Sequence, residues 1–205
     1  SAKVELKNSL PGWSLPAGVH FGSGKAEGKT ALLFPGQGAQ YTNMLSDLAC
    51  RFPEFLDCLQ GSEDVSPLIN RAIYPFQTFD GDKQKEQVAF LAKTNNAQPA
   101  LAAVSAGSLE ILRRFGLNYD VTAGHSFGEL TALYAAGAFD SEYLYKLAAE
   151  RGRLMASDGK DRGTMAAMFT SKENAETLIA EKKLDVVLAN HNTPEQVVLS
   201  GSTEG

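Results

Sequence analysis

Gly124-His125-Ser126-Phe127-Gly128-Glu129 is the stretch that decides the fold of this chain. It lies between an apolar run over residues 119–123 and a helix-like run over residues 130–137. The order of strand, Gly-x-Ser-x-Gly and helix is typical of a nucleophile elbow, a sharp turn that lifts a serine hydroxyl clear of a sheet. The pattern predicts Ser126 as a nucleophile. The alternative, a Gly-Ser loop that contains a histidine, fits the strand and helix context less well.

The composition of the 205-residue chain is that of a soluble globular protein, with 43% hydrophobic and 21% charged residues. The formal net charge of -5 argues against nucleic-acid binding, which requires an excess of Lys and Arg. Cys50 and Cys58 lack the spacing of a metal site, so we expect reduced thiols in a cytoplasmic protein. No apolar stretch approaches the roughly 20 residues of a membrane helix, and residues 1–29 lack the apolar region of a signal peptide.

Three segments are expected: a linker over residues 1–29, a core over residues 30–159 and a smaller subdomain over residues 160–205. The linker is rich in Pro and Gly and shows no sustained periodicity. Alternating strands and helices in the core predict the α/β class, with a mainly parallel sheet covered on both faces. The elements expected there are a strand at 31–34, a helix at 44–58 interrupted by Pro53, a polar irregular stretch at 61–85, a helix at 99–115 with Pro99 in its first turn, a strand at 120–123 and helices at 130–137 and 141–155.

The smaller subdomain is predicted to contain a strand, a helix and two further strands. Their expected ranges are 163–169, 171–183, 185–189 and 195–199, and Ser171 is the expected helix cap. This order is the first two-thirds of a ferredoxin-like unit, so we expect an incomplete ferredoxin-like subdomain. The missing helix would leave an apolar face of the sheet exposed to solvent. Val187, Val197 and Leu199 are the candidate residues of that face. We therefore expect the chain to be a fragment or to have a partner segment.

An activated serine requires an oxyanion hole and a base. The backbone N–H of Phe127, at a helix N-terminus, and the glycine-rich turn around Gln37 are candidates for the hole. The base is harder to find. His20 lies in the expected linker and His125 adjoins the nucleophile, and both positions favour a structural role. His191 follows a predicted strand but lies in a turn-like setting, so it is a minority candidate.

Five motifs occur in order along the chain. They are Phe34-Pro35-Gly36-Gln37-Gly38-Ala39-Gln40, Ala97-Gln98-Pro99-Ala100, the elbow, Arg151-Gly152 and Asn190-His191-Asn192-Thr193-Pro194-Glu195-Gln196-Val197-Val198. Together they resemble the malonyl-CoA:acyl carrier protein acyltransferase family, and the resemblance spans residues 30–201. Within the family, the elbow and the residues after it are most similar to the acyltransferase domains of polyunsaturated fatty acid synthases and enediyne-type polyketide synthases.

The resemblance implies an α/β-hydrolase-like core and a serine that carries a malonyl group from coenzyme A to the phosphopantetheine thiol of an acyl carrier protein. No metal or organic cofactor is implied, and other synthase domains are expected as partners. The family's catalytic histidine belongs to a motif beyond the end of this chain. The implied roles are Ser126 as nucleophile, Gln37 and Phe127 as backbone oxyanion donors, Arg151 as the malonyl carboxylate clamp, and Gln98, His125 and Asn190 as residues that line or border the site.

The chemistry of Arg151 supports the implied clamp, because a planar guanidinium pairs with both oxygens of a carboxylate. With Arg151 as the clamp, Arg153 is the solvated neighbour. The alternative for Arg151 is an exposed arginine near a helix end that pairs with carbonyl groups or with Glu150. An acidic carrier protein would require a local basic patch. Its candidates, which are equally compatible with ordinary solvated charges, are Lys160, Arg162, Lys172, Lys182 and Lys183.

Two other functions remain open at this point. A serine hydrolase or thioesterase would share the elbow and differ in letting water reach the acyl-serine. Arg151 and the Gly36–Gly38 turn argue against it. The second alternative is a catalytically incomplete or structural module within a synthase.

Overall fold

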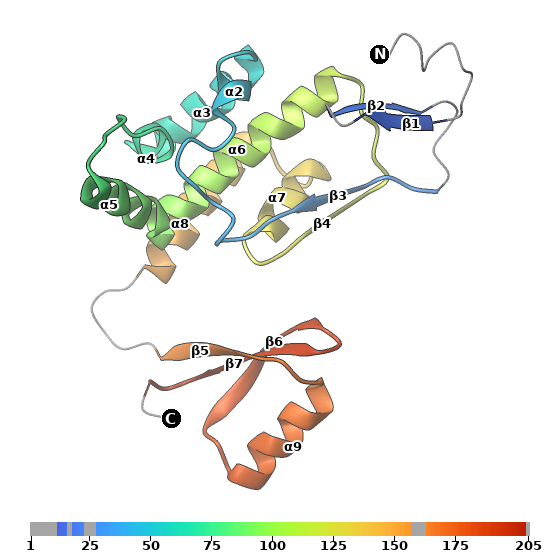
Figure 1. Cartoon of the computed structure of the whole chain (residues 1–205), viewed down its shortest axis with the longest axis vertical. Helices are drawn as coiled ribbons and strands as arrows, with labels where there is room; N and C mark the ends of the chain where they lie inside the picture. Colours follow the sequence, from blue (N-terminus) through green and yellow to red (C-terminus); the bar gives the residue numbers. More distant parts are fainter. Residues whose placement is uncertain (1–11, 16–17, 23–27, 157–162, 204–205) are drawn as a thin grey trace. The chain divides into compact units, whose positions relative to one another are not determined.

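The structure is a computed structural model of the chain and describes residues 12–15, 18–22, 28–156 and 163–203 (Figure 1). The chain divides into two compact units, Ser1–Leu154 and Met155–Gly205. The boundary expected at residue 159 lies outside the described residues.

The first described element is an antiparallel hairpin of β1 (Gly12–Leu15) and β2 (Val19–Gly22). The rings of Trp13 and Phe21 face each other across it, with centroids 5.6 Å apart. Gly18 has a φ of 75°, a conformation that glycine adopts without strain, and its N–H donates to the carbonyl of Leu15. The prediction of a linker without elements is therefore wrong for residues 12–15 and 18–22. The rest of residues 1–27 lies outside the described residues.

A second sheet of the first unit is a parallel pair of strands. β3 (Ala31–Phe34) pairs with β4 (Val121–Gly124), with Phe34 opposite Gly124. Both strands lie where the sequence predicts them, to within one residue. Phe34 points into the core. Side chains alternate along a strand, so Leu33 points to the other face, where it is 77% exposed to solvent. Within the described residues the sheet has two strands and one covered face, so the expected cover on both faces is wrong.

The longest helix of the unit is α6 (Thr94–Arg114), and it lies alongside several other helices (Figure 1). It begins five residues before Pro99, so the prediction that Pro99 occupies the first turn is wrong. The polar stretch 61–85, predicted as irregular, is largely helical. Its last helix begins at Gly81, where Asp80 accepts hydrogen bonds from the N–H groups of Asp82 and Lys83. The helices before α6 are α2 (Ser46–Ala49), α3 (Pro53–Val65), α4 (Ile69–Ile73) and α5 (Gly81–Ala92).

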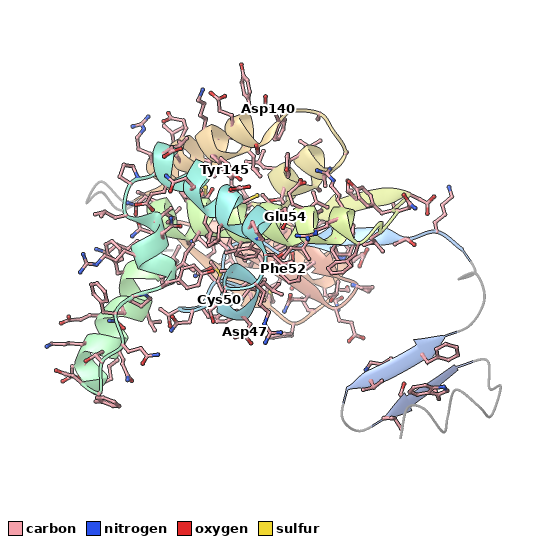
Figure 2. The ribbon with its side chains drawn as sticks, turned by 90° about the horizontal axis from the view of Figure 1, so that it is seen from above. Asp47, Cys50, Phe52, Glu54, Asp140 and Tyr145 are labelled. Carbon is pink, nitrogen blue, oxygen red and sulfur yellow. The ribbon has the colours of Figure 1, made fainter. Side chains whose placement is uncertain are left out.

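Helices α3 and α6 run antiparallel, since the start of one contacts the end of the other. Phe52 packs edge-on against Phe115 with a centroid distance of 5.9 Å. Glu54, which Figure 2 labels beside Phe52, accepts a hydrogen bond from Arg114 at 2.6 Å. At the middle of α6, Gly107 lies so close to the ring of Phe55 that a Cβ there would stand 2.7 Å from it. This close packing fixes the position of α6.

The elbow helix α7 (Gly128–Ala135) contacts both strands of the sheet, and α8 (Ser141–Met155) follows it. The hydroxyl of Thr122, on β4, donates to the carbonyl of Ala132 at 2.9 Å. Leu144 and Ala148 of α8 are fully buried in the same core as Phe34. The sheet, α6, α7 and α8 therefore share one hydrophobic core, and both helices predicted after the elbow are confirmed.

The second unit is an antiparallel sheet with one helix, in the predicted order of strand, helix, strand, strand. Its elements are β5 (Thr164–Met168), α9 (Lys172–Lys182), β6 (Val186–Thr193) and β7 (Gln196–Gly201), and the strand order is β5-β7-β6. The hydroxyl of Ser171 accepts from the N–H of Asn174, which confirms the predicted cap.

Two details of the second unit differ from the sequence analysis. Val197 is fully buried, so its predicted place on a solvent-exposed face is wrong. Leu199 lies on the same face by the alternation of β7 and is partly buried. Val187, at 65% exposed, does lie on the open face. Asn190 and His191, predicted in a turn, belong to β6 because that strand continues to Thr193.

Among the described residues, no helix combines the length and the apolar character that crossing a membrane would require.

Candidate active site

Ser126 occupies a strained position between the end of β4 and the start of α7. Its φ is 53°, in the left-handed region that a residue with a side chain rarely adopts. The turn is fixed on both sides, because the N–H of His125 donates to the carbonyl of Phe34 at 3.1 Å and the N–H of Gly128 donates to that of His125 at 2.9 Å. Strained backbone held by surrounding hydrogen bonds is characteristic of functional turns. The elbow predicted from the sequence is therefore present.

Glycines allow three backbone segments to meet around Ser126. A Cβ on Gly128 would stand 2.1 Å from the carbonyl oxygen of Phe34, and one on Gly124 would stand 2.0 Å from that of Gly128. A Cβ on Gly36 would lie 2.4 Å from the carbonyl oxygen of His125 and 3.1 Å from the Cβ of Ser126. The turn after β3 therefore lies directly against the elbow.

Two backbone N–H groups near Ser126, those of Gln37 and Phe127, have no hydrogen-bond acceptor within the described part of the chain. Phe127 is the residue that precedes the first turn of α7, where the helix dipole places partial positive charge. Its side chain is fully buried in the core, so only its backbone can serve the site. Unpaired amides of this kind are suited to an oxyanion.

Arg151, on α8, points its guanidinium at the elbow. Its Nη1 donates to Oε1 of Gln98 at 2.9 Å, and its Nη2 lies 3.5 Å from Oγ of Ser126. Gln98 is fully buried, so its amide holds the guanidinium from within the core. Glu150 pairs instead with Arg153, at 2.6 Å, which keeps the pKa of Glu150 below its usual value. The alternative pairing of Arg151 with Glu150 is therefore wrong.

Gly152 allows α8 to approach the start of α6 closely. A Cβ at this position would lie 2.9 Å from the carbonyl oxygen of Thr94 and 3.0 Å from Cα of Asn95. Arg151 directly precedes Gly152, and Gln98 lies one helical turn after Thr94. This contact between helices explains how Arg151 comes within hydrogen-bond distance of Gln98, 53 positions away.

Thr94 is a site residue that the sequence analysis missed. Its hydroxyl accepts a hydrogen bond from Nε2 of Gln37 at 3.0 Å. It belongs to none of the five motifs. The only sequence signal for it is its spacing of four residues from Gln98, which places both residues on one face of a helix.

The three histidines have different surroundings, and within the described residues none of them forms a hydrogen bond with Ser126. His125 is exposed beside the nucleophile. His20, on β2, pairs with the hydroxyl of Ser14 at 2.9 Å. His191 and Asn190 belong to the second unit. The described part of the chain also contains no cluster of three or more His, Cys, Asp or Glu side chains that could hold a metal ion.

The candidate basic patch is described only in part. Lys160 and Arg162 lie outside the described residues. Lys172, at the start of α9, lies 3.7 Å from Glu176, so its charge is partly compensated. Lys182 and Lys183 are exposed at the end of the same helix.

Comparison with known proteins gives the family. The model of the acyl transferase domain family matches residues 31–205. The chain belongs to this family. The match covers nearly the same residues as the five motifs, so the resemblance inferred from the sequence is confirmed.

Two relatives within the acyl transferase family are similar over most of the chain. A polyunsaturated fatty acid synthase polypeptide of Thraustochytrium is 37% identical over 94% of this chain and 7% of its own length. The malonyl CoA-acyl carrier protein transacylase of Synechocystis is 37% identical over 86% of this chain and 56% of its own length. The chain thus spans a small part of the synthase polypeptide and about half of the single transacylase.

A solved structure in the acyl transferase family has a similar fold. It is a type II polyketide synthase acyl carrier protein in complex with its malonyl transacylase. The match has a TM-score of 0.73 and 30% identity, over 86% of this chain and 56% of that one. The predicted mixture of helices with a parallel sheet is confirmed at this level.

Proposed function

We propose that the protein carrying this chain is a malonyl-CoA:acyl carrier protein S-acyltransferase in fatty acid or polyketide synthesis. The observation that carries the proposal is the guanidinium of Arg151 placed 3.5 Å from the hydroxyl of Ser126. A nucleophile beside a carboxylate-binding group suits an acyl donor that bears a second carboxylate, as malonyl does. The similarity to malonyl transacylases supports the same substrate.

The first half-reaction forms an ester on Ser126. A histidine acting as general base removes the hydroxyl proton, and Oγ attacks the thioester carbonyl of malonyl-CoA. The developing oxyanion accepts hydrogen bonds from the backbone N–H groups of Gln37 and Phe127. The carbon–sulfur bond then breaks, and coenzyme A leaves as the thiol with the proton held by the histidine.

The second half-reaction regenerates the serine. The phosphopantetheine thiol of a carrier protein attacks the carbonyl carbon of the malonyl ester, and the oxyanion that forms is held by the same two amides. The bond between this carbon and Oγ then breaks, which leaves the malonyl group as a thioester on the carrier. The proton of the thiol passes through the base to Oγ of Ser126. The chemistry requires no metal and no organic cofactor, because every bond change is a substitution at a carbonyl carbon.

Arg151 and Gln98 select the donor in this scheme. The guanidinium of Arg151 forms a charge-assisted pair with the free malonyl carboxylate. The buried side chain of Gln98 meanwhile accepts a hydrogen bond from Nη1 of the same guanidinium. His125 is proposed to border the bound substrate. The exposed lysines of the second unit, Lys172, Lys182 and Lys183, are proposed to attract an acidic carrier protein.

We also propose the wider setting of the domain. The first unit corresponds to an α/β-hydrolase-like core, supported by the elbow and the parallel strands. The second corresponds to part of a ferredoxin-like subdomain, supported by its antiparallel strand order. The parent protein acts in the cytoplasm beside other synthase domains.

Transfer is tested by incubating the full natural polypeptide with labelled malonyl-CoA, with and without a holo carrier protein. The proposal predicts label on the carrier protein and slow release of free malonate when no carrier is present. Rapid release of malonate with no labelled carrier would instead assign a hydrolase or thioesterase. Absence of both products would assign a module without catalysis. Ser126→Ala is the control, and it should abolish both transfer and release.

A further inference from the structure

The first residue of α6 contacts both halves of the site. The hydroxyl of Thr94 accepts a hydrogen bond from the side chain of Gln37, 57 positions away, at 3.0 Å. The backbone carbonyl of Thr94 packs against Gly152, the neighbour of Arg151. Thr94 therefore connects the turn after β3 with the helix that carries the guanidinium.

The turn around Gln37 is held at a few points in the described structure. Gly38 has a φ of 110°, which glycine adopts without strain, and the N–H of Ala39 donates to the carbonyl of Gly36 at 3.3 Å. The amide of Gly38 is held by Oε1 of Gln40 at 2.7 Å. The amide of Gln37 has no acceptor in the described part of the chain. Its direction depends on how the rest of the residue is held, and the Gln37 side chain is bonded to Thr94.

We infer that Thr94 is a positioning residue: its hydroxyl holds the side chain of Gln37 so that the backbone N–H of Gln37 is directed at the acyl oxyanion on Ser126. This inference rests on the function proposed above. An oxyanion forms on the thioester carbonyl of every acyl donor, so Thr94 affects a step common to all donors. Arg151 differs, because it binds a carboxylate that only some donors carry.

The test compares Thr94→Val, which keeps the shape and removes the hydroxyl, with Thr94→Ser, which keeps the hydroxyl. In the full polypeptide, Thr94→Val is expected to slow acylation of Ser126 about threefold to tenfold, the effect of one hydrogen bond. The loss should be equal for malonyl-CoA and acetyl-CoA and lie in kcat rather than KM. Thr94→Ser should restore the rate. Gln37→Leu combined with Thr94→Val should lose no more than either change alone.

A second measurement does not depend on acyl transfer. Hydrogen–deuterium exchange of the peptide that contains Gln37 should be faster in Thr94→Val than in the parent and should return to the parent rate in Thr94→Ser. If the parent does not acylate Ser126 but exchange follows this pattern, the proposed function fails and the restraint on the turn stands.

Three results would overturn the inference. The first is an acylating parent whose rate is unchanged by Thr94→Val. The second is a Thr94→Ser variant that acylates Ser126 as slowly as Thr94→Val, or whose Gln37 peptide exchanges as fast as in Thr94→Val. The third is a loss confined to malonyl-CoA, which would mean that Thr94 acts through Gly152 and Arg151 instead.

Discussion

Nη2 of Arg151 lies 3.5 Å from Oγ of Ser126, and Nη1 of the same guanidinium is bonded to Gln98. One edge of the arginine is thus fixed by a buried amide and the other faces the nucleophile. A fixed guanidinium loses little conformational entropy when it binds a carboxylate. The arrangement is prepared for a donor whose reacting carbonyl and free carboxylate lie close together.

Replacing Arg151 with Ala is expected to reduce transfer of malonyl far more than transfer of acetyl. Hydrogen bonds to charged groups contribute about 1.5–3 kcal/mol, so kcat/KM for malonyl-CoA should fall about tenfold to a hundredfold more than that for acetyl-CoA. The measurement is steady-state kinetics with both donors. Arg153→Ala is the matched control, since that arginine is exposed and pairs with Glu150. Equal losses for the two donors would reject the clamp.

Gln98→Glu should also act against malonyl. The new carboxylate would lie beside Arg151, occupy its guanidinium and repel the carboxylate of the donor. We expect kcat/KM for malonyl-CoA to fall by about tenfold or more, with a smaller loss for acetyl-CoA. Gln60→Glu, the same exchange on the exposed side of α3, should leave the ratio of the two donors unchanged. An unchanged ratio in Gln98→Glu would mean that Gln98 does not govern the arginine.

Gly128→Ala is expected to destabilise the fold severely. The new Cβ would stand 2.1 Å from the carbonyl oxygen of Phe34, which is backbone and cannot move aside. The free energy of unfolding should fall by about 3 kcal/mol or more. Gly81→Ala is the control, because open space surrounds that position at the start of α5, and its effect should stay within about 1 kcal/mol. Urea unfolding of both variants provides the comparison, and similar midpoints would contradict the close approach of β3 and α7.

The two cysteines should differ in reactivity. Cys50 is exposed, whereas burial raises the pKa of the Cys58 thiol and so lowers its thiolate fraction at any given pH. A thiol reagent at mildly alkaline pH should modify Cys58 at least about tenfold more slowly than Cys50. Peptide mapping after timed labelling measures both rates. In urea the two rates should become similar, and equal rates in the native protein would contradict the burial of Cys58.

The sequence identified the parts of the site whose geometry is local. The elbow follows from the order of an apolar run, two glycines around Ser126 and a helix, and the strand at 31–34 follows from its apolar run and the Pro-Gly turn behind it. These signals lie within a few residues of one another, so periodicity and turn chemistry suffice to find them.

Contacts distant in sequence could not be predicted in this way. The bond between Gln37 and Thr94 spans 57 positions, and no periodicity connects them. The predicted helix begins at Pro99, so it does not include Thr94, the residue at which α6 begins. The helices within 61–85 were missed because their polar residues face solvent, although the capping Asp80 was visible in the sequence. The roles assigned to Asn190 and His191 remain predictions, since both residues belong to the second unit.

The most direct test of the account is the site of acylation. The full natural polypeptide is mixed with malonyl-CoA, quenched in acid, digested and examined by mass spectrometry for a malonyl ester. We predict the ester on the peptide that contains Ser126, its absence in Ser126→Ala and its removal when a holo carrier protein is added before the quench. A malonyl group on another residue, or an ester that forms equally in Ser126→Ala, would contradict the account.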